Sequence, residues 1–164
     1  MRNLIIALLI TFKGYSQEIK ITKDGITDFV ISECKGISKK EIYNKTIEWI
    51  SLNYVNPNEV IIAKVENEFL RFNFIDNKYM PTKVLIEIQF KDGRYKFDPL
   101  SIEFPNVPIP YNDFINTYDR FFNKKGLLKP RTAKTVNSVE EILNDVNDNL
   151  KNYIVGVKNK MDDW

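Results

Sequence analysis

Hydrophobic and polar residues alternate most regularly from residue 83 to residue 104, KVLIEIQFKDGRYKFDPLSIEF. Successive side chains of a strand point to opposite faces of a sheet, so this alternation predicts two strands that each bury one face. Asp92-Gly93 separates the two runs, and Asp-Gly favours a two-residue type I′ turn. The sequence therefore predicts a β-hairpin that turns at Asp92-Gly93.

The two-residue turn also fixes which residues face each other across the hairpin. The expected pairs are Phe90–Tyr95 and Ile88–Phe97 on the apolar face, and Lys91–Arg94 and Gln89–Lys96 on the polar face. Hydrophobic pattern and turn thus agree on one register. After Phe97 the apolar positions change parity, and Pro99 cannot donate a hydrogen bond to a neighbouring strand. We expect a bulge or a break at Asp98-Pro99.

Three predicted segments come first in the domain. Residues 17–25 are polar with alternating isoleucines and predict an edge strand or a loose N-terminus, and residues 26–34 predict a strand that places Phe29 and Ile31 on one face. Ser38 and Glu41 form a capping box, which predicts a helix over 38–54. Its apolar stripe is Tyr43, Ile47, Ile50 and Tyr54.

Residues 59–76 predict a second hairpin, which turns within Glu66-Asn67-Glu68. A tight turn there places two apolar sets on the same side of the sheet. These sets are Ile61, Ala63 and Val65 on the first strand, and Leu70, Phe72 and Phe74 on the second.

The C-terminal half predicts two more helices. Pro105, Pro108 and Pro110 favour an extended connection out of the sheet. Residues 112–127 then show a broad apolar face and end at Gly126, which suits a helix C-terminus with Leu127 packed against Phe122. Residues 128–137 form a basic, polar loop, and a second capping box at Ser138–Glu141 opens a helix over 138–157.

The order of elements is therefore β-α-β-β-β-β-α-α, which predicts an α+β fold. An antiparallel sheet of about five strands carries Ile61, Phe72, Ile88, Phe90 and Phe97 on its inner face, and the helices at 38–54 and 138–157 cover that face. The candidate site residues are apolar or aromatic and belong either to a closed core or to a ligand-binding face: Trp49, Phe72, Ile88, Phe90, Tyr95, Phe97 and Tyr153.

The first residues have the pattern of an exported protein. Arg2, the apolar run 4–12 and small residues at 14 and 16 predict a signal peptide over 1–16, followed by a single domain over 17–164. Its removal lowers Lys plus Arg from 24 to 22, which equals the 22 Asp plus Glu. A domain of zero formal charge gives no electrostatic footprint for nucleic acid. We expect a periplasmic or extracellular protein with no membrane span after cleavage.

The residues of common active sites are missing. The chain has no His and one Cys, Cys34, which excludes Ser-His-Asp and Cys-His catalysis, CxxC pairs and nearly all catalytic zinc sites. We expect no enzyme activity, no cofactor, no metal and a packed Cys34 thiol. Glu66 and Glu68 fit a solvated turn better than a general acid/base pair, and the basic loop lacks the glycine-rich turn of a phosphate site.

Four stretches resemble a family of secreted Bacteroidetes domains with a TBP-like fold, domain-of-unknown-function family 4468: the signal ending in YSQ, SKKEIYNKTIEWI, EVIIAKVENEFLRFNF and KDGRYKF with the last helix. The resemblance covers most of residues 26–157. It implies an antiparallel sheet with helices packed on one face and brings no activity and no catalytic residues. The segment ENEFLRFNF departs from the family pattern because it is more aromatic and less rich in glycine.

Three functions follow as hypotheses. The leading one is a non-enzymatic binding or interaction module of the bacterial envelope. A second is a carrier of a small apolar ligand, held in a cavity between the sheet and the C-terminal helix. A third is a hydrolase that uses two carboxylates in one cleft and no His. If nothing covers the polar face of the hairpin, a partner would meet its four polar residues: Gln89, Lys91, Arg94 and Lys96.

Overall fold

The computed structural model describes residues 18–108, 112–115 and 117–156, so the expected signal peptide over 1–16 lies outside the described residues. The elements are β1 (Ile21–Thr22), β2 (Gly25–Ile26), β3 (Val30–Glu33), α1 (Lys39–Asn53), α2 (Pro57–Val60), β4 (Ile61–Val65), β5 (Phe69–Asp76), β6 (Thr82–Lys91), β7 (Arg94–Glu103), the 3-10 helix η1 (Tyr118–Phe121) and α3 (Ala133–Val155).

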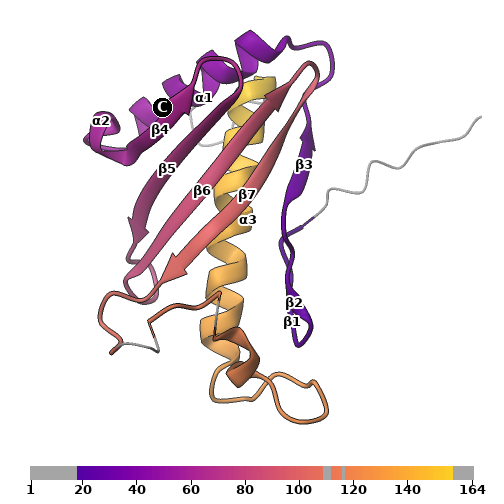
Figure 1. Ribbon diagram of the computed structural model, residues 1–164, viewed down its shortest axis with the longest axis vertical. Coiled ribbons are helices and arrows are strands. Elements are labelled where there is room, and N and C mark those ends of the chain that lie inside the picture. The colour runs from indigo at the N-terminus through magenta and orange to yellow at the C-terminus, as the bar shows by residue number, and fades with distance from the viewer. Residues whose placement is uncertain (1–17, 109–111, 116, 157–164) are drawn as a thin grey trace, which may run out of the picture.

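Five strands form one antiparallel sheet in the order β3-β7-β6-β5-β4, and β1 and β2 form a separate hairpin. Helices α1 and α3 lie behind this sheet in Figure 1, and no helix of the described residues covers the face turned toward the viewer. The predicted α+β fold, with about five antiparallel strands and helices packed on one face, is confirmed. We call the face toward α1 and α3 the inner face and the opposite one the outer face.

The central hairpin has the predicted register. Lys91 pairs with Arg94, and Gln89, Phe90 and Ile88 have the expected partners. The predicted type I′ turn is wrong. That turn requires a positive φ at both central residues. Gly93 has a φ of +74°, but Asp92 does not have a positive φ, since Asn67 is the only non-glycine residue with positive φ in the described part of the chain. Contacts from the β3–α1 connection hold the turn instead. Asp92 Oδ1 accepts from Lys39 N (2.7 Å), and Gly93 N donates to Ile37 O (2.9 Å).

The predicted bulge is present on β7. Ile86 pairs with Pro99 and Leu85 with Ser101, which leaves Leu100 as the extra residue. This insertion restores the inward orientation of the apolar side chains beyond it, so Ile102 is completely buried. The change of parity in the sequence therefore has the structural cause that was expected.

Helix α1 begins at the predicted capping residue. Ser38 Oγ accepts a hydrogen bond from Glu41 N at 3.2 Å. The buried face is rotated slightly from the predicted stripe, since Thr46 is fully buried between Tyr43 and Ile50 whereas Ile47 is only half-buried. Thr46 tolerates burial because its hydroxyl donates to Ile42 O at 2.8 Å.

The second hairpin is also confirmed, with its turn at residues 66–68 and Asn67 at a φ of +59°. Leu70, Phe72 and Phe74 are buried as predicted. The first strand is less buried than expected, because β4 is an edge strand with a bulge after Ile61. Val65 is 43% exposed.

The predicted helix over 112–127 is wrong. Asn112 O accepts from Phe104 N and Phe114 N donates to Ile102 O, so this segment extends the pairing of β7. Phe114 is completely buried against Phe104, with 5.6 Å between the ring centroids. Only η1 is helical. Gly126 lies in a turn closed by Asn123, and Leu127 is 62% exposed rather than packed on Phe122.

Helix α3 begins at Ala133, five residues before the predicted cap. Ser138 is therefore inside the helix, where its hydroxyl donates to Thr135 O at 2.9 Å. Glu141, the acidic residue of the predicted box, accepts from Lys78 Nζ and the Tyr79 hydroxyl instead. Its neighbour Glu140 accepts from Ile21 N at 2.6 Å and so holds the β1–β2 hairpin on the helix. The helix ends at Val155, two residues before the predicted end, and Gly156 follows it with a φ of +73°, the left-handed conformation that often closes a helix.

Candidate functional site

The seven candidate residues lie in or beside the core between the sheet and the two helices. Six of them are buried: Trp49, Phe72, Ile88, Phe90, Tyr95 and Phe97. Tyr153 is half-buried and packs against this core. The aromatic rings contact one another edge-on, with 5.4 Å between the centroids of Tyr43 and Phe90 and 6.3 Å between those of Trp49 and Phe72.

One polar cluster crosses this core. The Tyr95 hydroxyl donates to the carbonyl O and Oδ1 of Asn147, both at 3.0 Å, and Ser32 Oγ donates to the same Oδ1 at 3.0 Å. Burial raises the pKa of Tyr95 far above its ordinary value, so the phenol stays protonated. The cluster ties β3 and β7 to α3 and contains no group that is poised for proton transfer.

The inner face offers no cavity for an apolar ligand among the described pockets. These pockets open at the surface, beside Tyr79, around the β1–β2 hairpin and on the outer face of the sheet. Of the seven candidate residues, Tyr95 alone lines one of them, the outer-face pocket. Beneath α3, Leu143 and Leu150 are completely buried. The candidate residues are therefore core residues.

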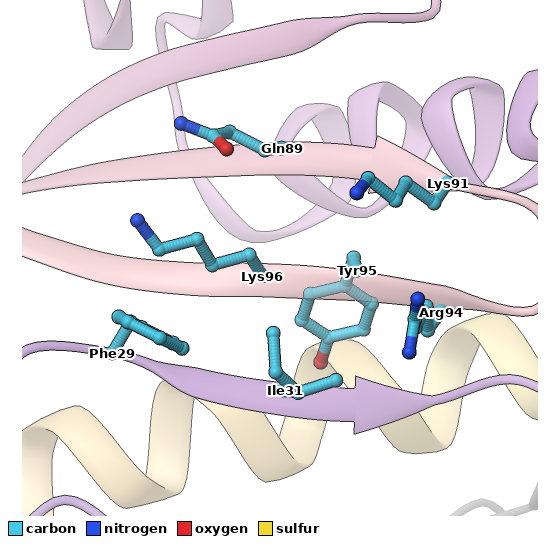
Figure 2. A pocket seen from close by; sticks show the side chains of 7 residues that line it. All are labelled: Phe29, Ile31, Gln89, Lys91, Arg94, Tyr95 and Lys96. Atoms are coloured by element: carbon cyan, nitrogen blue, oxygen red, sulfur yellow. The ribbon is translucent and has the colours of Figure 1, made fainter.

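The outer-face pocket is a groove of about 320 Å³ across β3, β7 and β6, which we call the hairpin groove. Its lining residues are Phe29, Ile31, Gln89, Lys91, Arg94, Tyr95 and Lys96. Figure 2 shows Phe29 and Ile31 along one side and the long polar side chains of the hairpin along the other. The four polar residues that the sequence assigned to the outer face all contribute to it.

The cations of the hairpin groove differ in their surroundings. Lys96 Nζ lies 2.6 Å from Asp98 Oδ2 and 4.5 Å from the centre of the Phe29 ring. Lys91 and Arg94 make no ion pair with any described carboxylate. Glu33 is the cross-strand neighbour of Arg94. Two of the three cations thus remain available to a ligand or partner.

Beside the groove, Glu87 is a nearly buried carboxylate on the outer face. Its oxygens accept from Arg71 Nε and from Gln89 Nε2, both at 2.6 Å. Burial acts to raise the pKa of Glu87, but the hydrogen bonds from Gln89 and Arg71 outweigh it, so the pKa is lowered. Glu87 is therefore ionised at neutral pH.

Three further residues were candidates for chemistry: Cys34, Glu66 and Glu68. Cys34 is buried, which raises the pKa of its thiol to about 11 and keeps it protonated. Among the described residues, no group of three or more His, Cys, Asp and Glu could hold a metal ion. Glu66 and Glu68 are exposed in their hairpin turn, as expected. Within the described ranges, no helix is long and apolar enough to cross a membrane.

The fold has known structural counterparts. The structure matches a DUF4468 family protein from Bacteroides ovatus with a TM-score of 0.59 and 12% identity, over 90% of this chain and 94% of that one. It also matches a TBP-like protein from Parabacteroides distasonis with a TM-score of 0.55 and 14% identity, over 79% and 92% of the two chains. The fold is TBP-like. The resemblance predicted from the sequence is thereby confirmed as a structural match.

At these identities the likeness establishes the fold alone, and neither name states an activity. No protein-family model matches the sequence, and no curated protein matches it. The function must therefore be argued from the site.

Sequence reasoning missed that Phe29 and Ile31 complete the hairpin groove. Their alternation placed them on one face of a strand, but nothing in the local pattern showed that this strand pairs with β7. The register Ile31↔Lys96 creates the groove, and it joins residues 65 positions apart in the chain.

Proposed function

We propose that this chain is an exported envelope domain that acts as a non-enzymatic binding module, and that a protein partner docks on the outer face of its sheet. One observation carries the proposal: the inner face is occupied by the core, whereas the outer face holds a groove with two cations, Lys91 and Arg94, that pair with no carboxylate of the described residues. Arg and aromatic residues, such as Arg94 and Phe29 in this groove, are enriched at protein interfaces.

Export rests on the N-terminal pattern. Residues 1–16 combine a positive start, an apolar run and a small-residue cleavage site. Mass spectrometry of the mature protein from the producing cell should show a chain that begins at Gln17. Retention of the first sixteen residues would contradict this part of the proposal.

The carboxylate-hydrolase hypothesis has one favourable feature on the same face. Glu87 and Asp98 are cross-strand partners in the sheet. Each is held by a cation, however, Glu87 by Arg71 and Asp98 by Lys96. The lowered pKa of Glu87 opposes the protonated state that a general acid requires. Turnover of an envelope glycan or peptide that is lost on Glu87→Gln would contradict a non-enzymatic role.

A site-specific crosslink tests the binding surface. A photo-reactive amino acid at Lys91, which lines the groove, should give a covalent protein adduct in the producing cell. The same group at Lys40, an exposed residue of α1, is the control. Equal adducts at both positions, or an adduct at Lys40 only, would overturn the proposal. The mass of the adduct gives the size of the partner.

A further inference from the structure

The outer face of the central hairpin carries its charges in an ordered series. Three cross-strand pairs lie on this face in succession from the turn: Lys91–Arg94, Gln89–Lys96 and Glu87–Asp98. Successive pairs on one face are about 6.6 Å apart, twice the rise of a strand residue. The hairpin therefore has a cationic pair at its turn end and a carboxylate pair about 13 Å further along, with the Gln89–Lys96 pair halfway between.

We infer that a second copy of this chain docks on the outer face, with the two sheets face to face around a twofold axis that crosses the strands at the Gln89–Lys96 pair. This inference rests on the proposed function, because it names the occupant of the same face. The symmetry reverses the direction of the strands. Lys91 then lies opposite Glu87 of the second copy, and Arg94 lies opposite Asp98 of the second copy.

The series of charges favours a second copy over an acidic partner. An acidic surface that matched Lys91 and Arg94 would also meet Glu33 beside Arg94, and further along the strands Glu87 and Asp98, whose charges Arg71 and Lys96 only partly offset at one side. Like charges that face each other across an interface are unfavourable. A twofold-related copy brings a carboxylate to Lys91 and to Arg94 and a cation to Glu87 and to Asp98, because an isologous interface pairs residue i with j and j with i.

The Gln89–Lys96 pair lies on the proposed axis, and its two side chains bend away from it. Lys96 Nζ leans toward Asp98 and the Phe29 ring, and Gln89 Nε2 donates to Glu87. Both side chains thus turn toward the carboxylate pair, which keeps the two Lys96 ammonium groups apart. Both side chains line the hairpin groove, which extends from Phe29 beside Lys96 to Lys91 and Arg94 near the turn (Figure 2). Docking would place the partner copy's carboxylate end, with its own Phe29, over this groove.

This arrangement also gives a burial site to Phe29, which is 42% exposed in the single chain. Face-to-face sheets pack about 10 Å apart with strand directions within about 30° of each other. Opposed charges in the paired rows would therefore meet through side chains rather than through backbone contacts. The expected dimer is salt-sensitive, since its contacts are charged and border solvent.

Sedimentation equilibrium of the mature chain tests the inference. The wild type should dimerise, and Arg94→Asp should weaken dimerisation about tenfold or more, because each symmetric contact occurs twice. Lys40→Glu makes a charge reversal on α1, away from the outer face, and should dimerise as the wild type does. A monomeric wild type at several hundred micromolar, or a dimer insensitive to Arg94→Asp, would overturn the inference.

A charge exchange sharpens this test. Arg94→Asp and Asp98→Arg each place like charges together twice in a homodimer. Mixed in equal amounts, the two variants place opposite charges together at both contacts, so the mixture should form heterodimers while each variant alone is monomeric. Two folded variants that fail to associate on mixing would contradict the inference. If Asp98→Arg does not fold, loss of the dimer on Lys91→Glu, with Lys40→Glu unaffected, decides the question.

The outcome separates the inference from the proposed function. A crosslink from position 91 to a different protein, with the chain itself monomeric, would overturn the second copy as occupant and leave the outer face as the binding surface. A dimer that is insensitive to Arg94→Asp, together with adducts from Lys40 alone, would overturn both.

Discussion

The two faces of β7 differ in what completes them. On the inner face, Tyr95 and Phe97 are at most 1% exposed and pack within the hydrophobic core. Arg94 directly precedes Tyr95 in the strand but lies on the outer face. It is exposed and makes no ion pair with a described carboxylate. The same strand therefore has a packed inner face and a solvent-exposed outer face.

This difference assigns separate roles to the faces. The inner face stabilises the fold through buried apolar area. The outer face carries Lys91 and Arg94, which make no ion pair with a described carboxylate. Aromatic residues that look alike in the sequence, such as Phe29 and Phe97, thus have different consequences when they are changed. Substitutions on each face test this separation.

The largest expected effect is on the inner face. Phe97→Ala removes a completely buried ring and should lower the free energy of unfolding by about 3–5 kcal/mol. Phe29→Ala, a matched change on the outer face, should cost about 1 kcal/mol or less. Urea denaturation measures both. Similar losses for the two variants would contradict the separation of the faces.

A smaller loss is expected for Tyr95→Phe. The variant keeps the ring but removes the hydroxyl that donates to Asn147, so it should lower the free energy of unfolding by about 1–2 kcal/mol. The control is Tyr79→Phe, which removes a hydroxyl that bonds to Glu141 at the surface. A neutral Tyr95→Phe would show that the buried cluster does not stabilise the packing of β7 on α3.

Glu87 should make stability depend on pH. Its pKa is lower in the folded state than its ordinary value of 4.5, so its stabilisation is present above pH 4.5 and is lost as the pH falls through the folded pKa. Glu87→Gln should therefore lose less stability between pH 5 and pH 3 than the wild type, by about 1 kcal/mol or less. Denaturation at both pH values measures the difference, with Glu66→Gln in the exposed turn as control. Identical pH dependence in wild type and Glu87→Gln would contradict this assignment.

The sequence was informative where local and tertiary preferences agree. The turn at Asp92-Gly93, the register of its strands and the bulge around Leu100 follow from alternation, because a shift by one residue would bury charges. Ser38 caps α1 as its spacing predicts. Only the turn type failed, since contacts from Ile37 and Lys39 set its backbone.

Local patterns misled where a distant partner decided the structure. The apolar spacing around Phe114 resembles a helix face, yet Phe114 N pairs with Ile102 O and the ring fills the core beside Phe104. Glu141 has the spacing of a capping box, but its carboxylate accepts from Lys78 Nζ and the Tyr79 hydroxyl. The hairpin groove was predicted only in part for the same reason. Its polar residues follow from the local alternation of the hairpin, whereas Phe29 reaches the groove through the pairing of β3 with β7, which is distant in sequence.

The most direct test measures association and stability on the same protein. For Arg94→Asp, sedimentation equilibrium and urea denaturation should show weakened dimerisation, together with a free energy of unfolding within about 0.5 kcal/mol of the wild type when both are measured as monomers. This result would place binding on the outer face and stability on the inner one. Unchanged association, or a loss of stability as large as that of Phe97→Ala, would contradict the division between the two faces.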